Sequence, residues 1–184
     1  FLPFEESVVQ ANHHHDYTAR EWALAYVETN RLLARIGERL KEELTVRGVR
    51  AVNEPPTHNF DPLKLVSRWS HKSVAALAGL GSFGLHHMLI TPAGCAGRFG
   101  SVVMDAELEA TPKVKEEYCL YRYDGSCLVC VENCPVGALT EEGLERRACY
   151  ERCLEVDRFY ADLGTTDCCG KCALGPCALG PAVC

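Results

Sequence analysis

The sequence lacks both long hydrophobic runs and an excess of basic charge. No apolar run reaches the roughly 18 residues that a membrane-spanning helix needs, and no signal peptide is visible in the 184 residues. Lysine and arginine together number 19 against 25 acidic residues, which gives a net charge of −6. Because binding to a phosphate backbone needs a basic surface, these absences argue against a membrane protein and against nucleic acid as a partner.

Cysteine, in contrast, is abundant. The chain has 12 cysteines, and they crowd into its last third. Cys-x2-Cys pairs in a chain of this length favour metal binding over a disulfide framework. We therefore expect reduced thiols and a cytoplasmic protein. From Cys119 onward there are 6 basic and 10 acidic residues, a balance that suits docking onto a basic redox partner.

The cysteine spacing is typical of a protein that holds two [4Fe-4S] clusters and moves electrons. The first block reads Cys119-x7-Cys127-x2-Cys130-x3-Cys134-Pro135, Cys149 follows alone, and the last block reads Cys169-x2-Cys172-x4-Cys177. In such a Cys-Pro ending the last cysteine ligates the other cluster. The expected ligands therefore form two interleaved sets: the first set is Cys119, Cys127, Cys130 and Cys177, and the second set is Cys134, Cys149, Cys169 and Cys172.

Some ligand assignments stay open on the sequence alone. Cys168 competes with Cys169, and Cys153 competes with Cys149 from one helical turn away. Zinc is the alternative metal, since two Cys-x2-Cys pairs can build a tetrahedral site, but eight aligned cysteines exceed the needs of one zinc ion. Cys95 and Cys184 have no obvious partner, and Cys95 is interpreted as a small buried residue.

The patterns predict a mixed architecture. A long helix is expected from a capping box at Thr18–Glu21 to about Arg47, with a buried stripe of Trp22, Tyr26, Leu33, Ile36, Leu40 and Leu44. Before it, 12–16 is expected to be a polar loop. Short strands are expected at 49–52 and 100–105, and a helix at 70–78. A charged linker at 107–117 divides an α+β core at 1–112, whose first strand begins before residue 1, from an iron–sulfur domain at 113–184.

A glycine motif, Gly79-x-Gly81-x-x-Gly84, matches a dinucleotide-binding fingerprint. That fingerprint has meaning only between a strand and a full crossover helix. Here the preceding residues look helical and Pro92 follows too soon, so we reject a Rossmann site. The glycines instead indicate a tight turn, or a close approach of the backbone to a packed helix or a planar cofactor.

A longer combination of motifs resembles the superfamily of epoxyqueuosine reductases and reductive dehalogenases. It runs from Trp69-Ser70-His71-Lys72 through Ala78-Gly79-Leu80-Gly81-Ser82-Phe83-Gly84 and Ile90-Thr91-Pro92 to Arg98-Phe99-Gly100-Ser101, followed by the cysteine blocks. The resemblance covers about residues 65 to 180. It implies a nitroreductase-like α+β core with an appended ferredoxin-like domain, and clusters that reduce a cobalamin. The residues that it places at the cofactor are Gly79, Gly81, Gly84, Thr91 and Arg98.

The chain also departs from that family. The Gly-Lys-Asn that follows the glycine turn in the enzymes is here Gly84-Leu85-His86-His87, and the region that meets tRNA has no counterpart in the sequence. No residue matches the family's catalytic proton donor, so the catalytic residues are unassigned.

Two functions follow from these patterns. In the first, a ferredoxin- or flavodoxin-type partner supplies electrons through the clusters to a corrinoid, a flavin or a small-molecule substrate in the core, with His71, His86 or His87 as candidate proton donors. In the second, the chain is a non-catalytic electron carrier or partner subunit. A structural metal protein ranks behind both. A cavity beside a cluster, lined by the glycine turn, would favour the enzyme.

Overall fold

The computed structural model describes residues 1–15, 17–55 and 60–183 of the chain. In these residues every sheet is a two-stranded antiparallel ribbon, and helices make up most of the remaining regular structure, so the architecture is α+β. The pairs are β1 (Leu2–Pro3) with β7 (Gly97–Arg98), β2 (Ala51–Glu54) with β8 (Ser101–Met104), β3 (Phe60–Asp61) with β4 (Val66–Ser67), and β5 (Ser82–Phe83) with β6 (Leu89–Ile90).

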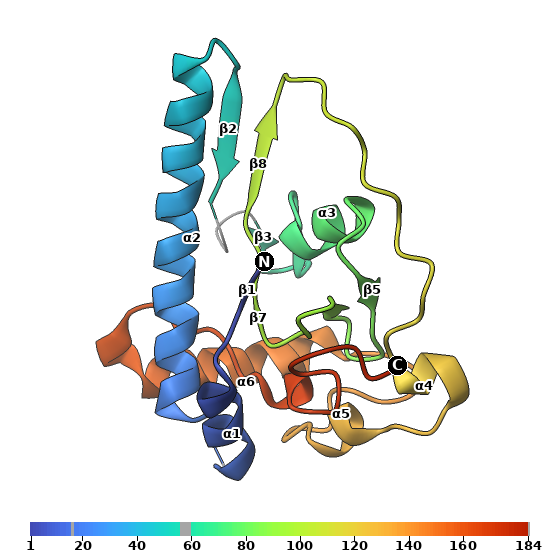
Figure 1. Cartoon of the computed structure of the whole chain (residues 1–184). Helices are drawn as coiled ribbons and strands as arrows, with labels where there is room; N and C mark the ends of the chain where they lie inside the picture. The colour runs from blue at the N-terminus through green and yellow to red at the C-terminus, as the bar shows by residue number, and fades with distance from the viewer. Residues whose placement is uncertain (16, 56–59, 184) are drawn as a thin grey trace.

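The long helix α2 (Arg20–Val46) runs along the side of the molecule, and the β2–β8 ribbon lies beside its C-terminal half (Figure 1). The expected helix is confirmed, and Gly48 ends it with a positive φ of 78°. The prediction of a buried stripe along this helix is correct only for its first half. Trp22 and Tyr26 are buried, but Ile36 and Leu40 are exposed, because only the N-terminal half of α2 packs on the main core.

The start of the chain differs from the sequence prediction. Residues Glu6–His14 form helix α1, where a polar loop was expected from residue 12; Asp16 lies outside the described residues. The expected capping box is also wrong. The N-cap of α2 is Ala19, and the hydroxyl of Thr18 donates instead to the carbonyl of Cys169 at 3.2 Å. The buried Asn12 accepts from the N–H of Ala19 at 3.0 Å, which ties α1 to the residue just before α2.

Helix α3 (His71–Leu77) and strand β8 occur close to where the patterns predict them. Ser70 caps α3 by accepting a hydrogen bond from the N–H of Ser73. The glycine turn then leads into β5, and residues 107–117 contain no helix or strand and descend along one side of the molecule to the C-terminal part (Figure 1). This arrangement agrees with the rejection of a dinucleotide fold.

The C-terminal part consists of short helices that present the cysteines. They are α4 (Leu120–Asp124), α5 (Val129–Glu132), α6 (Arg146–Phe159), and the 3-10 turns η1 (Ala161–Leu163) and η2 (Lys171–Ala173). The carboxylate of Glu145 caps α6 by accepting from the N–H groups of Arg147 and Ala148 at 2.9 and 2.6 Å. None of the helices in the described part of the chain is long and apolar enough to cross a membrane.

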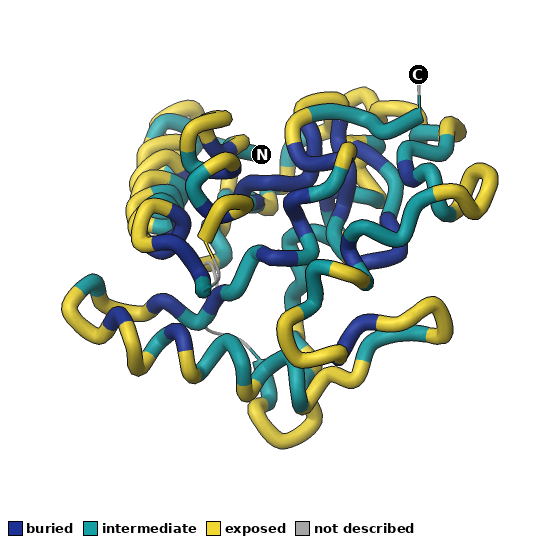
Figure 2. The backbone as a smooth tube through the Cα atoms, turned by 90° about the horizontal axis from the view of Figure 1, so that it is seen from below, coloured by how far each residue is buried: buried dark blue, intermediate teal, exposed yellow. Residues whose placement is uncertain are grey.

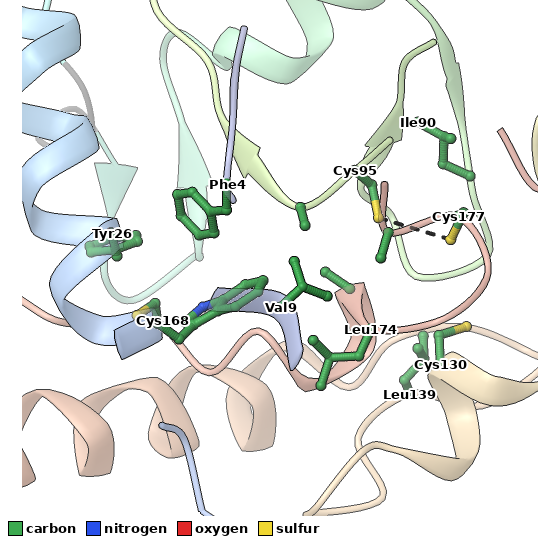
Figure 3. Packing of buried hydrophobic residues seen from close by; sticks show 14 of the residues in the cluster. Phe4, Val9, Tyr26, Ile90, Cys95, Cys130, Leu139, Cys168, Leu174 and Cys177 are labelled. Carbon is green, nitrogen blue, oxygen red and sulfur yellow. Dashed lines mark hydrogen bonds between the residues drawn. The ribbon is translucent and has the colours of Figure 1, made fainter. Parts of the chain in front are cut away.

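One hydrophobic core joins the two ends of the chain. Phe4 and Trp22 meet edge to face, with ring centroids 4.9 Å apart, and the same cluster includes Cys168, Leu174 and Cys177 (Figure 3). Buried backbone is concentrated where these segments converge, whereas the outer face of α2 is exposed (Figure 2). The cysteine-bearing segments are therefore held by residues from the first quarter of the sequence.

Candidate metal centres

The four thiols of the first set line one small cavity of about 20 Å³. Cys119 precedes α4, Cys127 precedes α5, Cys130 lies in the first turn of α5, and Cys177 comes from the C-terminal loop. Among the described residues that line this cavity none carries a formal charge, and most of the rest of the wall is apolar. A tight group of cysteine sulfurs in an apolar surrounding is the donor set of a [4Fe-4S] cluster.

The ionisation of these thiols fits a site for a cationic group. Burial, and after it the neighbouring Cys177, Cys119 and Cys127, raise the pKa of Cys130 to about 11. Thiolates placed this close disfavour one another unless a positive centre compensates them. Metal binding removes that cost because it requires and stabilises the deprotonated form.

A histidine and a further cysteine contact the first set. His86 Nε2 lies 3.3 Å from Cys177 Sγ, and the thiol of Cys95 lies 3.9 Å from the same sulfur (Figure 3 marks the Cys95–Cys177 contact). All three side chains are buried. Cys95 therefore does have a partner in a cysteine set, which the sequence did not indicate, because 82 residues separate it from Cys177.

The second set is grouped around Cys172, which lies in η2. Cys172 is within electrostatic range of Cys169, Cys149 and Cys134, and also of Cys130 in the first set, and burial raises its pKa above the ordinary value. The two sets are therefore neighbours. Gly170 between Cys169 and Cys172 has a φ of 76°, and its Cα faces the indole of Trp22, so no side chain fits there.

Cations surround the second set. The Lys72 ammonium interacts with Cys172 and Cys149, and burial lowers its pKa. Arg152 lies beside Cys169 with its guanidinium 3.9 Å from the ring centroid of Tyr17. A hydrogen bond from Cys153, together with the nearby Lys72, lowers the pKa of Cys149 to about 7. These groups stabilise thiolate at the second set by charge.

The two competing cysteines lie at the edge of the second set. Cys153 is one turn along α6 from Cys149 and hydrogen-bonds to it. Cys168 is part of the hydrophobic core, and burial raises its pKa to about 12. Cys172 lies within electrostatic range of Cys169, which favours Cys169 over Cys168 as a donor.

The second set also borders a large cavity of about 820 Å³, which is within the range of small-molecule and cofactor sites. Cys149 and Cys153 form part of one wall, and three cationic side chains, Lys72, Arg98 and Arg146, line the same space. Asp167 opposes them as a carboxylate that accepts from the Tyr26 hydroxyl at 2.6 Å. The guanidinium of Arg98 lies 4.3 Å from the ring centroid of Tyr26, and Asn30 accepts from its Nε.

The residues that the resemblance placed at a cofactor are not gathered around the large cavity. Of the five, Arg98 lines the large cavity, but the other four are absent from its described lining. A Cβ on Gly79 would overlap the carbonyl of Pro112, and one on Gly81 would overlap the carbonyl of Ile90. Gly84 faces His86, and the buried Thr91 hydroxyl donates to the carbonyl of Gly94. The glycine turn thus packs against protein backbone and side chains.

The three candidate proton donors occupy different places. His87 is exposed, lines the large cavity and has its pKa lowered by burial. His71 lines an adjoining cavity of about 190 Å³, and its Nδ1 is 2.6 Å from the hydroxyl of Ser101. His86 is buried against Cys177 and is not among the described residues that line either cavity.

The arrangement defines an α+β protein with a cysteine-rich C-terminal part and a basic cavity against it. Solved structures of epoxyqueuosine reductase share this fold. A selenomethionine-labelled epoxyqueuosine reductase matches over 81% of this chain with a TM-score of 0.58 and 20% identity. The enzyme with a stem loop of epoxyqueuosine-modified tyrosine tRNA gives the same values. The resemblance seen in the sequence motifs is thereby confirmed for the fold.

This likeness concerns part of a larger protein. The chain spans 39% and 38% of the length of these two solved chains. No protein-family model matches the sequence, and the search of curated proteins found no match. The features of this chain that bear on its function are therefore its two cysteine sets and the large cavity.

Proposed function

We propose that the protein is an iron–sulfur oxidoreductase with two [4Fe-4S] clusters. The first set would hold one cluster, and the second set, with Cys149 and Cys169 as the donors in preference to Cys153 and Cys168, would hold the other in a ferredoxin-like region. The donor chemistry supports this: each set offers four thiols, and the sets are close enough for Cys172 and Cys130 to interact. A ferredoxin- or flavodoxin-type protein would deliver the electrons.

The electron acceptor would bind in the large cavity. The observation that carries this step is that Cys149 lies in the wall of a space of about 820 Å³ with Lys72, Arg98 and Arg146 around it. A non-catalytic carrier needs no such space beside its cluster. The cations fit an acceptor with an anionic group, and cobalamin and flavin mononucleotide both carry a phosphate. When bound, such a group would supply the reducing chemistry, while the chain would orient its phosphate and limit its access to water.

The first test is metal content and spectrum of the protein purified without oxygen. About eight irons per chain and a visible absorption that dithionite bleaches are expected. Zinc in place of iron, with no reducible chromophore, would refute the proposal and support a structural metal protein.

The second test concerns the cavity. Cobalamin, flavin mononucleotide and inorganic phosphate are each titrated into the iron-loaded protein, and binding is measured by calorimetry. At least one should bind, and the Lys72→Met variant should bind it at least tenfold more weakly than Lys64→Met, which removes an exposed lysine outside the cavity lining. Eight irons with no binding of any of the three would favour the electron carrier.

A further inference from the structure

Three buried side chains outside the large cavity form a contiguous group. His86 Nε2 is 3.3 Å from Cys177 Sγ and 3.6 Å from Cys95 Sγ, and the two sulfurs are 3.9 Å apart. His86 and Cys177 both line the small cavity of the first set, while Cys95 stands behind them. The expected ligands of the clusters leave His86 and Cys95 unused.

A backbone hydrogen bond fixes which nitrogen of the His86 ring accepts. The N–H of Met88 donates to His86 Nδ1 at 3.0 Å, so this nitrogen carries a lone pair. A neutral imidazole with an acceptor Nδ1 has its proton on Nε2. His86 Nε2 therefore donates toward the sulfur of Cys177, with Cys95 Sγ as a second, longer contact.

The backbone also fixes the positions of the two cysteines. The N–H of Cys95 donates to the carbonyl of Cys177 at 3.0 Å, and the N–H of Ala96 donates to Ala178 at 3.0 Å. Gly94 has a φ of 82°, and a Cβ there would overlap the backbone of Ala178. This close pairing of two distant segments holds the Cys95 thiol against Cys177.

Gly84 provides room for the imidazole. A Cβ at this position would lie 2.7 Å from Cε1 of His86 and 3.1 Å from its Nδ1. The last glycine of the Gly-x-Gly-x-x-Gly motif therefore has a local role. Its lack of a side chain leaves room for the imidazole in the position where it contacts both Met88 and Cys177. The group is assembled by the glycine turn, the 94–96 segment and the C-terminal loop.

We propose that His86 and Cys95 are positioning residues that donate hydrogen bonds to the Cys177 sulfur and thereby set the reduction potential of the cluster held by the first set. This rests on the proposed function, since it requires that cluster. Hydrogen bonds to cluster sulfurs are among the factors that set the potential. They stabilise the extra negative charge of the reduced state, so the two donors raise the potential of this cluster and leave the other unaffected.

The test measures potentials by anaerobic redox titration followed by electron paramagnetic resonance, with iron counted on the same samples. His86→Leu removes the donor but fills the space, whereas His86→Gln keeps an N–H at a comparable reach. His86→Leu should lower the equilibrium constant for reduction of one cluster at least tenfold, which is about 59 mV for one electron. His86→Gln should restore most of it, and Cys95→Ala should give a smaller shift in the same direction.

The controls separate this inference from the function on which it rests. His14→Leu, the same change at an exposed histidine of α1, should leave both potentials at the wild-type value. Absence of iron from the unmodified protein would refute the proposed function. With both clusters present, unchanged potentials in His86→Leu, or an equal fall in His86→Gln, would refute the hydrogen-bond role. Loss of half the iron in Cys95→Ala would also refute it, because Cys95 would then be a ligand.

Discussion

The two cysteine sets are neighbours, but their surroundings differ in kind. The first set lies in a small cavity without charged lining residues, where neutral donors, His86 and Cys95, contact one sulfur. The second set lies among cations, with Lys72 near Cys149 and Arg152 near Cys169, and it borders the large cavity. Hydrogen bonds from Cys95 and His86 lower the pKa of Cys177 to about 5, and a hydrogen bond from Cys153 together with Lys72 lowers that of Cys149 to about 7. Neutral donors thus act at the first set, and full charges act as well at the second.

The difference suggests a direction for electrons. A site without access to the large cavity can receive and hold an electron, but only the site at the cavity wall can pass it to a bound molecule. Full charges in the wall can also attract an anionic acceptor, which neutral dipoles in a closed site cannot do over a distance. Under the proposed function, the first set would therefore store or relay an electron and the second would deliver it.

Removing one ligand from each set should have the largest effect and tests whether the sets are separate. Cys130→Ala and Cys172→Ala should each lose about half of the iron, because a cubane with three protein thiolates is held poorly. The double variant should lose nearly all of it. Iron analysis of the anaerobically purified proteins measures this.

Cys168→Ala is the matched control, since it removes a neighbouring cysteine that lies in the hydrophobic core. Its iron content should equal that of the unmodified protein. Loss of all iron in Cys172→Ala alone would show that the two sets form one cooperative unit, and the comparison between them would fail.

Two glycines, one beside each cysteine set, should differ in how much their replacement destabilises the protein. Gly170 needs a left-handed backbone and faces Trp22, so Gly170→Ala should lower the free energy of unfolding by about 2–4 kcal/mol. Gly175, near the first set, has its nearest side-chain atom, in Val129, 3.5 Å from a Cβ. Gly175→Ala should therefore change the free energy of unfolding by less than about 0.5 kcal/mol.

Denaturant unfolding without oxygen, followed by circular dichroism, measures both variants at equal iron content. Comparable losses would mean that the contact of Gly170 with Trp22 does not restrain the second set. The second set would then be held in place by the residues of its own segment and not by packing against α2.

The charge beside the second set provides the third test. Lys72→Met keeps the length of the side chain and removes its ammonium group. A positive charge favours reduction of a nearby cluster. In the variant, the equilibrium constant for reduction of the second cluster should therefore be about tenfold lower, which is a fall in its potential of about 59 mV. The first cluster should keep its potential, and the variants that lack one set assign the two reduction steps. A shift confined to the first cluster would contradict the assignment of Lys72 to the second.

The sequence could predict those features that depend on short spacing. Helices α2 and α3 and strand β8 follow from local patterns, and the division of the eight cysteines into two ligand sets stays a prediction. The structure places the thiols of each set near one another, while ligation itself stays a prediction. The exposed half of α2 was mispredicted because periodicity marks an apolar stripe but not which part of it meets a core.

The remaining features depend on contacts between distant segments. The hydroxyl of Thr18 bonds to Cys169, 151 residues away, in place of capping its own helix. His86 meets Cys177 across 91 residues. The cations of the large cavity come from α3, β7 and the start of α6. No local pattern encodes these contacts, because they form only when segments far apart in the sequence pack together.

The smallest expected effect compares the extra cysteine of each set. Cys153 donates to Cys149 as Cys95 donates to Cys177, but Lys72 also acts on Cys149. A thiol is a weak donor, and its loss should matter less where Lys72 and Arg152 also act on the same set. Cys153→Ala should therefore keep all of the iron and change the reduction equilibrium constant of the second cluster less than Cys95→Ala changes that of the first. Loss of half the iron would instead make Cys153 the ligand in place of Cys149. A larger shift than that of Cys95→Ala would show that the second set also depends on hydrogen bonds, and the distinction between dipoles and charges would no longer hold.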